Sequence, residues 1–335
     1  MATAPVIWRR PAALLPQPFD SIFFDVDGVL LKTTASFRAA NIAVTEYITG
    51  EVNGLDWRQQ AADTLDTLIT PFDIELFKQA GGFNSDWDLS YLMTALSTAR
   101  LREWQGESIA QRPMQEWAAL AHEAALQERG GRAWVDTIVP ASARPDYALL
   151  TDIYNEIYWG AAELRKRFKR EPRYLPDAPG LVTKEEILYA PDFFRRLRAL
   201  GVRHLGMITG RNTPEVESAQ ERMEAYSGER WWDVVISADD YLKPDPQALR
   251  AAIAQVGTQG GLYIGDTADD FDLVRRYRAT HIEGKPEPEI LAAMVIYEYE
   301  IELYKQRGAD ALMHSVEGLL DLLAPSLTFR EEVQK

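Results

Sequence analysis

A short apolar run at residues 21–24 ends abruptly in charged positions. The run has the length and character of a buried β-strand, and Asp25, Asp27 and Gly28 follow it directly. Glycine adopts backbone conformations that other residues avoid, so Gly28 permits a sharp turn beside the two acids. The pattern predicts a strand that delivers two carboxylates to its carboxyl end.

The pattern becomes helical after Leu30 and stays so to about residue 183. Apolar side chains recur every three or four residues, most regularly at Ile153, Ile157, Ala161 and Leu164, which is the period of an amphipathic helix. No strand of convincing alternation interrupts them. The predicted helices span residues 35–49, 57–68, 71–80, 86–104, 113–129 and 146–168.

Helical and strand-like segments alternate from about residue 184 onward. The predicted strands span residues 202–208, 232–236, 261–264, about 280–283 and 310–313. The predicted helices span residues 190–200, 214–225, 246–256, 268–277, 287–306 and 316–323. Such alternation predicts a Rossmann-like α/β fold, a parallel sheet with helices on both faces, in which ligands bind at the carboxyl ends of the strands.

Two domains follow from this division of patterns. Residues 1–32 and 184–335 are expected to form the α/β core, and residues 33–183 a large all-α cap inserted into it, with hinges at 31–34 and about 176–185. Residues 1–19 contain four prolines and are expected to form an arm without regular structure.

Composition narrows the classes of function. The formal net charge of −15 argues against nucleic acid or an anionic membrane as the main partner. The chain has no cysteine, which excludes disulfides and thiolate metal sites. It has no apolar run of the roughly 20 residues that a membrane span needs, and its first residues do not resemble a signal peptide. We therefore expect a cytoplasmic protein, whose oligomeric state the sequence does not predict.

Four acids are expected to converge at the strand ends: Asp25, Asp27, Asp266 and Asp270. Each like-charged pair at ~4 Å costs about 1 kcal/mol in water and about 4 kcal/mol at an effective dielectric constant near 20. One lysine cannot offset that sum, whereas a divalent cation can. A site built only from oxygen ligands suits Mg²⁺.

Four segments together resemble the motif set of the haloacid dehalogenase superfamily, in its phosphatase branch. They read Asp-Val-Asp-Gly-Val-Leu at 25–30, Met-Ile-Thr-Gly-Arg at 207–211, Lys-Pro-Asp-Pro at 243–246 and Tyr-Ile-Gly-Asp-Thr-Ala-Asp-Asp at 263–270. The resemblance implies a Mg²⁺-dependent phosphomonoesterase that acts on a small phosphorylated metabolite through an aspartyl-phosphate. The helical insert lies between the first and second motifs, where one subclass carries its cap.

The resemblance also implies roles for the acids. Asp25 is the expected nucleophile and a metal ligand. Asp27 is the expected acid and base, and its backbone carbonyl is expected to reach the metal. Asp266 is the second expected metal carboxylate, and Asp270, or alternatively Asp269, is expected to support the metal waters or the lysine.

The remaining motif residues are expected to hold the phosphoryl group. Thr209 and the backbone N–H of Gly210 would bind its oxygens, and Lys243 would neutralise charge and orient the nucleophile. Arg211 is expected either to clamp a substrate phosphate or carboxylate or to pair with a surface acid.

Several alternatives stay open at this level. The dehalogenase branch lacks the second aspartate of the first motif, so Asp27 argues against it. A sugar-phosphate mutase shares the motifs, and a phosphonate hydrolase would need a cap lysine, for which Lys32 and Lys78 are candidates. A receiver-like phospho-acceptor and a non-catalytic binding protein on a degenerate enzyme fold are the alternatives outside enzymes.

Overall fold

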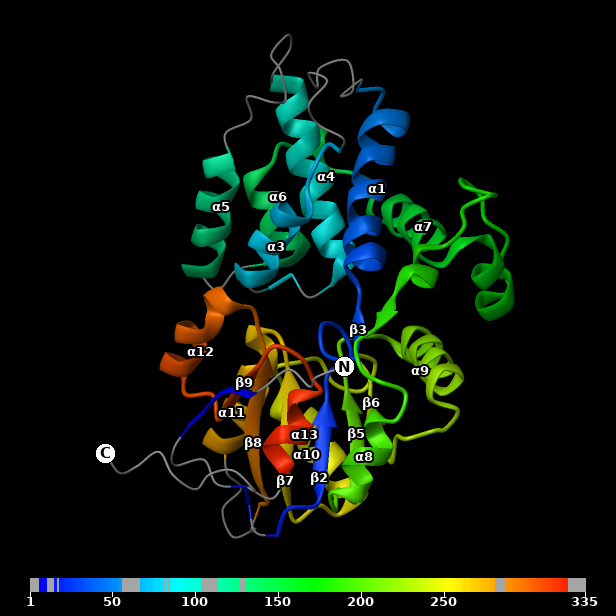
Figure 1. Cartoon of the computed structure of the whole chain (residues 1–335). Coiled ribbons are helices and arrows are strands. Elements are labelled where there is room, and N and C mark those ends of the chain that lie inside the picture. The colour runs from blue at the N-terminus through cyan, green and yellow to red at the C-terminus, as the bar shows by residue number, and fades with distance from the viewer. Residues whose placement is uncertain are drawn as a thin grey trace. The chain divides into compact units, whose positions relative to one another are not determined.

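The computed structural model describes residues 6–10, 15–16, 18–55, 67–80, 82–83, 85–103, 114–126, 130–280 and 287–324. The chain divides into two compact units, which we treat separately (Figure 1). The core unit comprises Met1–Lys32 and Glu186–Lys335, and the helical unit comprises Thr33–Glu185. Nearly all of the predicted helix 57–68 and of the predicted strand 280–283 lies outside the described residues.

The core unit contains a seven-stranded sheet of order β1-β9-β8-β7-β2-β5-β6. All neighbouring strands are parallel except β1, which is antiparallel to β9. The strands are β1 (Val6–Arg9), β2 (Ser21–Phe24), β5 (His204–Ile208), β6 (Val234–Ile236), β7 (Gly260–Gly265), β8 (Glu289–Val295) and β9 (Ala311–Met313). The sheet confirms the predicted α/β class.

Helices cover both faces of this sheet (Figure 1). They are α8 (Phe193–Ala199), α9 (Thr213–Ser227), α10 (Pro246–Val256), α11 (Ala268–Ala279), α12 (Ile301–Arg307) and α13 (Gly318–Leu323), with a short 3₁₀ turn at Glu298–Glu300. Successive side chains of a strand point to opposite faces, so Phe24 packs with α8, α9 and α13 while its neighbour Phe23 packs with α10 and α11. Both layers are apolar, which is why the strands read as continuous apolar runs.

The predicted helix at 287–306 is wrong in its first half. Residues Glu289–Val295 form β8, which pairs with β7 on one side and β9 on the other, and the α-helix starts only at Ile301, after the 3₁₀ turn at Glu298–Glu300. A central strand covered on both faces is buried at every position and loses its alternation, so its apolar run cannot be distinguished from a helix by periodicity. Burial, rather than intrinsic propensity, decides this segment.

The amino-terminal segment also differs from its prediction as an arm. Val6–Arg9 form β1 and pair with β9 at the edge of the sheet. The prolines of this region flank the strand and do not interrupt it, so they remove no hydrogen bond from the ladder.

The two segments of chain that connect the units pair with each other. Leu31–Lys32 form β3, which pairs antiparallel with Glu186–Ile187 in β4. A 3₁₀ turn at Leu181–Lys184 precedes β4. The division between units therefore falls at residues 32–33 and 185–186.

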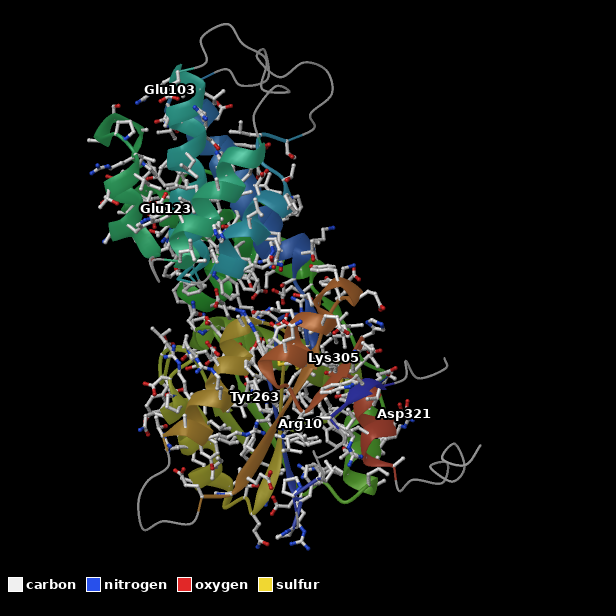
Figure 2. The ribbon with its side chains drawn as sticks, turned by 90° about the vertical axis from the view of Figure 1, so that its left-hand side faces the viewer. Arg10, Glu103, Glu123, Tyr263, Lys305 and Asp321 are labelled. Atoms are coloured by element: carbon white, nitrogen blue, oxygen red, sulfur yellow. The ribbon has the colours of Figure 1, made fainter. Side chains whose placement is uncertain are left out.

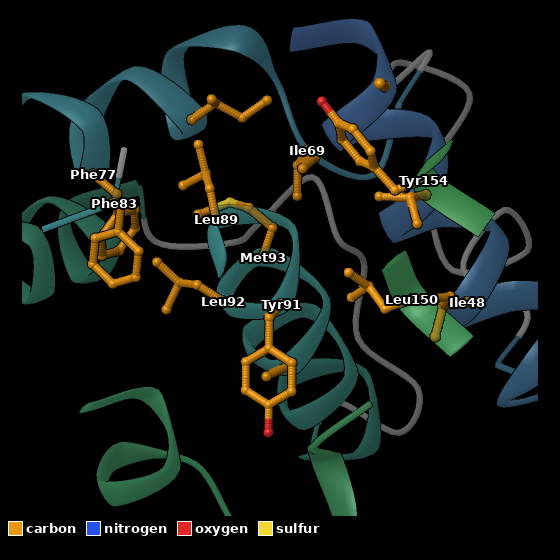
Figure 3. Close-up of a cluster of buried hydrophobic side chains, with 14 of the residues drawn as sticks. Ile48, Ile69, Phe77, Phe83, Leu89, Tyr91, Leu92, Met93, Leu150 and Tyr154 are labelled. Atoms are coloured by element: carbon orange, nitrogen blue, oxygen red, sulfur yellow. The ribbon is translucent and has the colours of Figure 1, made fainter. Parts of the chain in front are cut away.

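The helical unit has no strand among its described residues. Its helices are α1 (Ala39–Tyr47), α3 (Pro71–Ala80), α4 (Asp86–Glu103), α5 (Met114–Leu126), α6 (Gly131–Ile138) and α7 (Tyr147–Phe168). Short π-helical segments at Thr34–Arg38 and Ile48–Val52 flank α1, and a 3₁₀ turn at Ala141–Ala143 lies between α6 and α7. They share one apolar core, part of which is shown in Figure 3, where Phe77, Phe83 and Leu92 are among the labelled side chains. This unit has the apolar core of an independent domain.

One predicted helix of this unit is broken by a glycine. Gly160 interrupts α7 with φ of 71° and ψ of 169°. A Cβ at this position would lie 2.4 Å from the backbone nitrogen of Gly180, so the two glycines allow two backbone segments to touch. Helical periodicity continues through the break and gives no sign of it.

Candidate active site

The carboxyl ends of three adjacent strands meet at one edge of the sheet. Phe24 of β2 pairs with Met207 of β5 and with Ile264 of β7, so the next residues of all three strands lie at one level. The backbone N–H of Asp25 extends this ladder, donating to the carbonyl of Ile264 at 2.8 Å. The residues that follow the strands are therefore neighbours in space, although they are up to 241 positions apart in the chain, as Asp25 and Asp266 are.

The turn after β2 requires its glycine. Gly28 has φ of 76°, a conformation that L residues rarely adopt. A Cβ built on Gly28 would lie 1.8 Å from Oδ2 of Asp266, so any side chain there would displace this carboxylate. The close approach of Gly28 and Asp266 brings the first and fourth motifs together.

Three of the predicted acids form a cluster. Carboxylate oxygens of Asp25, Asp266 and Asp270 lie within 4.8 Å of one another. Asp25 and Asp270 are buried, with exposed fractions of 4% and 0%. Two buried acids and one half-buried acid, Asp266, repel one another at this spacing unless positive charge lies between them.

Lys243 supplies one such charge. Its Nζ lies 2.8 Å from Oδ1 of Asp25 and 2.7 Å from Oδ1 of Asp270. Burial alone lowers the pKa of Lys243, but the two carboxylates outweigh burial, so its pKa is raised and the ammonium is retained. The chain reaches this point after β6, and α10 then starts at the N-cap Asp245 followed by Pro246, a sequence that suits a helix start.

Asp270 is fixed by five donors. Oδ2 accepts from the Thr267 hydroxyl at 2.6 Å and from the backbone N–H groups of Thr267 and Asp266 at 3.1 and 3.3 Å. Oδ1 accepts from Lys243 at 2.7 Å and from the Tyr263 hydroxyl at 2.6 Å. Burial raises the pKa of Asp270, but Lys243 and these hydrogen bonds lower it more, so the group stays anionic.

Tyr263 is a member of this site that the sequence analysis gave no role. It is fully buried within the core unit (Figure 2) and lies on β7 three residues before Asp266. In the sequence it occupies one position of an apolar strand, and only the fold shows that its hydroxyl reaches Asp270. A tyrosine at the centre of a buried strand, three residues before a predicted metal acid, was the available signal.

The negative charges of Asp25 and Asp266 are less fully offset by neighbouring groups than that of Asp270. Burial, reinforced by Asp270 and Asp27, raises the pKa of Asp25 to about 7, although Lys243 opposes the shift. Burial, together with Asp270 and Asp25, raises the pKa of Asp266 well above its ordinary value. Oδ1 of Asp266 is buried and has no hydrogen-bond partner among the described residues.

Such a donor set fits a hard divalent cation. Mg²⁺ prefers carboxylate and carbonyl oxygens and completes its shell with water or phosphate oxygens. The orphaned oxygen of Asp266 and the raised pKa of Asp25 and Asp266 show that this donor set would be stabilised by a divalent cation.

Asp27 points to a different partner. The guanidinium of Arg211 donates from Nε at 2.9 Å and from Nη2 at 2.7 Å, both to Oδ1 of Asp27. Arg211 is 1% exposed, whereas the side chain of Asp27 is 33% exposed. The pairing joins residues 184 positions apart, and Arg211 reaches an acid of the first motif rather than a surface acid.

The predicted phosphate-binding residues lie beside this pair. Thr209 follows β5 directly and is buried, and its Oγ1 accepts from the backbone N–H of Arg211 at 3.2 Å. Asn212 then caps α9 by accepting from the N–H of Glu215 at 3.1 Å, which places the exposed Gly210 in the turn between strand and helix. Asp270 and Asp269 were the two acids predicted to support the metal waters or Lys243. Asp270 contacts Lys243, whereas Asp269 is partly exposed on α11.

The fold and this site define an α/β protein with an acidic centre at the carboxyl edge of its sheet. The family model described as haloacid dehalogenase-like hydrolase matches residues 19–276. This match spans more than half of the chain, so the chain belongs to the haloacid dehalogenase-like hydrolases. The predicted resemblance is therefore confirmed.

The chain is similar to solved structures, of which the first shows the shared fold. The chain is similar to the phosphatase Tt82 from Thermococcus thioreducens, with 24% identity and a TM-score of 0.56 over 90% of this chain and 99% of that one. It is also similar to a phosphonoacetaldehyde hydrolase-like protein from Oleispira antarctica, with 12% identity and a TM-score of 0.46 over 94% of each chain. No curated protein matched the chain. In the described part of the chain, no helix has both the length and the apolar character that a membrane crossing requires.

Proposed function

We propose that the protein is a Mg²⁺-dependent phosphomonoesterase that acts on a small phosphorylated metabolite through an aspartyl-phosphate. The observation that carries this proposal is the buried row Asp25–Lys243–Asp270 beside the orphaned carboxylate oxygen of Asp266. It provides a nucleophile, a cation that fixes it, and a place for a metal. Membership of the hydrolase family supports the same chemistry.

Asp25 is the proposed nucleophile. A carboxylate oxygen of Asp25 attacks phosphorus in line with the ester oxygen, so that a bond from Asp25 to phosphorus forms while the bond from phosphorus to the ester oxygen breaks. Lys243 fixes the orientation of Asp25 through Oδ1 and offsets charge on the transferring group.

Asp25 and Asp266 would hold the metal, together with the backbone carbonyl of Asp27. The bound ion would supply charge neutralisation between the acids and the phosphoryl oxygens. Asp270 belongs to the same cluster, but its oxygens already accept five hydrogen bonds. We therefore propose that Asp270 supports the site through Lys243 and the loop that carries Asp266.

Asp27 is the proposed acid and base. It gives a proton to the leaving oxygen in the first step and takes a proton from the attacking water in the second, which breaks the bond from phosphorus to Asp25 and releases phosphate. Arg211 occupies Oδ1 of Asp27 with two donors, so Oδ2 is the oxygen that would carry the proton. We propose that Arg211 positions Asp27 and does not itself clamp the substrate.

Thr209 and Gly210 would bind the phosphoryl oxygens from the end of β5, through the hydroxyl of Thr209 and the backbone N–H of Gly210. The helical unit, residues 33–183, is proposed to act as a cap, with the paired segments β3 and β4 at its two crossings as the hinge. Cap closure would exclude water while Asp25 attacks.

Phosphate release from a generic aryl phosphate tests this proposal. We expect turnover with Mg²⁺, none after chelation, and a loss of roughly 10⁴-fold or more in kcat for Asp25→Asn, as when other nucleophiles are removed. Activity that survives both chelation and the substitution would contradict the mechanism. A panel of phosphorylated metabolites then identifies the substrate class, and product analysis separates hydrolysis from phosphoryl migration by a mutase.

A further inference from the structure

A hollow lies in the core unit, and none of the residues of the carboxylate cluster lines it. It has a volume of about 300 Å³ and lies between α11, β8 and the turn after α12. Its wall consists of Phe271, Arg275, Arg278, Ala279, Ala292, Arg307 and Gly308. This volume is at the lower end of the range of sites for small molecules. We call it the arginine pocket, because three of its seven residues are arginines.

Two of the arginines come from one face of α11. Phe271, Arg275 and Arg278 are separated by four and three residues, a spacing that aligns side chains along a helix. Arg307 is the last residue of α12, and Gly308 follows it in a left-handed turn. The three arginines of the pocket thus come from two separate helices, α11 and α12.

Each of the three guanidinium groups contacts another group of the protein. Arg278 donates to the carbonyl of Ile290 from Nε at 2.9 Å and from Nη2 at 2.7 Å, and Arg275 donates from Nε to Asp272 at 2.8 Å. The guanidinium carbon of Arg307 lies 5.5 Å from the ring centroid of Tyr304. Each guanidinium has five N–H donors, so donors remain for a ligand after these contacts.

The pocket carries an excess of positive charge. Asp310 is buried and pairs with Arg278, but it is shared with Arg10, and it also accepts from the backbone N–H of Ala292. Among the described residues, Arg307 forms no salt bridge with a carboxylate, and Asp272 forms one with Arg275. The result is a local surplus of guanidinium groups in a chain whose formal net charge is −15. Figure 2 shows this side of the core unit, with Arg10 and Lys305 labelled.

The pocket is distinct from the proposed active site. Both involve α11, but Asp270 lies in its first turn and Arg278 eight residues later, which is about 12 Å along the helix axis. Asp310, which pairs with Arg278, directly precedes β9. It therefore lies at the amino ends of the parallel strands, whereas Asp25 lies at their carboxyl ends.

We propose that the arginine pocket binds a small oxyanion that carries two or more negative charges, such as a phosphate-bearing or polycarboxylate metabolite. Arginine forks match the oxygens of both groups, and guanidinium groups already held by the protein lose little freedom when an anion binds. The apolar floor formed by Phe271 and Ala292 leaves room for a short carbon skeleton. This proposal does not depend on the phosphatase activity.

Calorimetric titration of the full-length protein tests the pocket. The protein is first freed of metal and dialysed into chelator-free chloride buffer, because the uncompensated acids of the catalytic cluster then repel anions. Pyrophosphate and citrate are titrated separately, so that the two arms distinguish phosphate-bearing from carboxylate-bearing ligands. We expect saturable binding of one equivalent of at least one of them.

The variants locate the binding. The double variant Arg275→Gln with Arg307→Gln is expected to bind at least about tenfold more weakly, since charge-assisted hydrogen bonds are lost. Arg276→Gln, an exposed arginine on the same helix outside the pocket, is the matched control and is expected to bind as the wild type does. Circular dichroism melts verify that both variants fold. Absence of saturable binding by either anion, or equal binding by the double variant and the wild type, overturns the proposal.

Discussion

Buried carboxylates occur in both units, and they differ in how fully they are satisfied. In the helical unit, Glu156 is completely buried and accepts the backbone N–H groups of Arg173, Tyr174 and Leu175 at 2.6, 2.8 and 2.8 Å. Arg170 lies 3.5 Å from the same carboxylate. In the core unit, Asp266 keeps a buried oxygen with no partner among the described residues.

The difference distinguishes an acid with a structural role from the acids that we propose to be functional. Glu156 closes a loop onto α7 and leaves nothing for a ligand to complete. Asp25 and Asp266 are held close together at a free-energy cost that the described residues do not offset and that a bound cation would offset. Burial of an acid alone is therefore weak evidence of function, whereas burial with an unsatisfied oxygen is stronger evidence.

Among the residues that support Asp25, the largest effect on kcat is expected from removing the positive charge of Lys243. Lys243→Met deletes the ammonium between Asp25 and Asp270, and we expect kcat to fall by roughly 10³-fold, as when preorganised electrostatic groups are lost elsewhere. Steady-state kinetics with an aryl phosphate measures this. A loss of less than tenfold would show that the row Asp25–Lys243–Asp270 is structural, as Glu156 is.

The stability of the metal-free protein is expected to depend on Asp25 in a definite direction. Its folded-state pKa of about 7 lies above its ordinary value of 3.8, so the folded state binds the proton more tightly. The stability linked to this group is complete below the ordinary value and is lost as the pH rises through about 7. Asp25→Asn removes the group and should stabilise the metal-free protein at about pH 8 by up to a few kcal/mol, and by less at about pH 5.

Thermal melts of both proteins at the two pH values check this prediction. Addition of Mg²⁺ should stabilise the wild type at the higher pH and should do less for the variant, because the variant lacks one carboxylate ligand. A wild type that is as stable as the variant at both pH values would remove the contrast with Glu156.

Glu156→Gln tests the other side of the comparison. The amide nitrogen of glutamine cannot accept a hydrogen bond, so at least one backbone N–H of the loop loses its partner, at a cost of about 1–3 kcal/mol in the free energy of unfolding. Denaturant unfolding measures the loss. The kcat of the folded enzyme should stay within about twofold of the wild type, and a kcat that falls with little loss of stability would place Glu156 in the catalytic machinery instead.

The smallest effect is expected at Tyr263. Tyr263→Phe removes one of the five donors to Asp270, and we expect kcat to fall about tenfold with KM little changed, because the hydroxyl acts through Asp270 and Lys243 and not on the substrate. Tyr277→Phe is the matched control, since that hydroxyl donates to the carbonyl of Pro288. Equal kcat values for the two variants would show that the hydroxyl of Tyr263 only stabilises the core.

The sequence predicts most of the α/β architecture and the convergence of its acids. Asp25 and Asp266 were predictable because each directly follows an apolar strand, and the carboxyl ends of parallel strands meet at one edge. Helices such as α7 were predictable because their apolar residues recur every three or four positions. The family resemblance rests on the same positions.

Other features depend on tertiary contacts that periodicity does not encode. β8 is buried on both faces and so reads as a helix, and β1 forms because β9 offers an edge to pair with. Asp27, the partner of Arg211, lies 184 positions away in the chain, so the sequence alone could not identify which acid Arg211 contacts. In the sequence, Tyr263 is indistinguishable from the other apolar residues of its strand. The structure shows that its hydroxyl donates to Asp270.

The most direct test of the account is to trap the phosphoryl group on Asp25. The enzyme is mixed with substrate and Mg²⁺, quenched in acid during turnover and reduced with borohydride, which converts an acyl phosphate but not a free carboxylate into an alcohol. Peptide mass spectrometry is then expected to find homoserine at position 25 in the wild type and none in Asp25→Asn. Turnover by the wild type with an unmodified Asp25, or with the mark on another acid, would contradict the proposed mechanism.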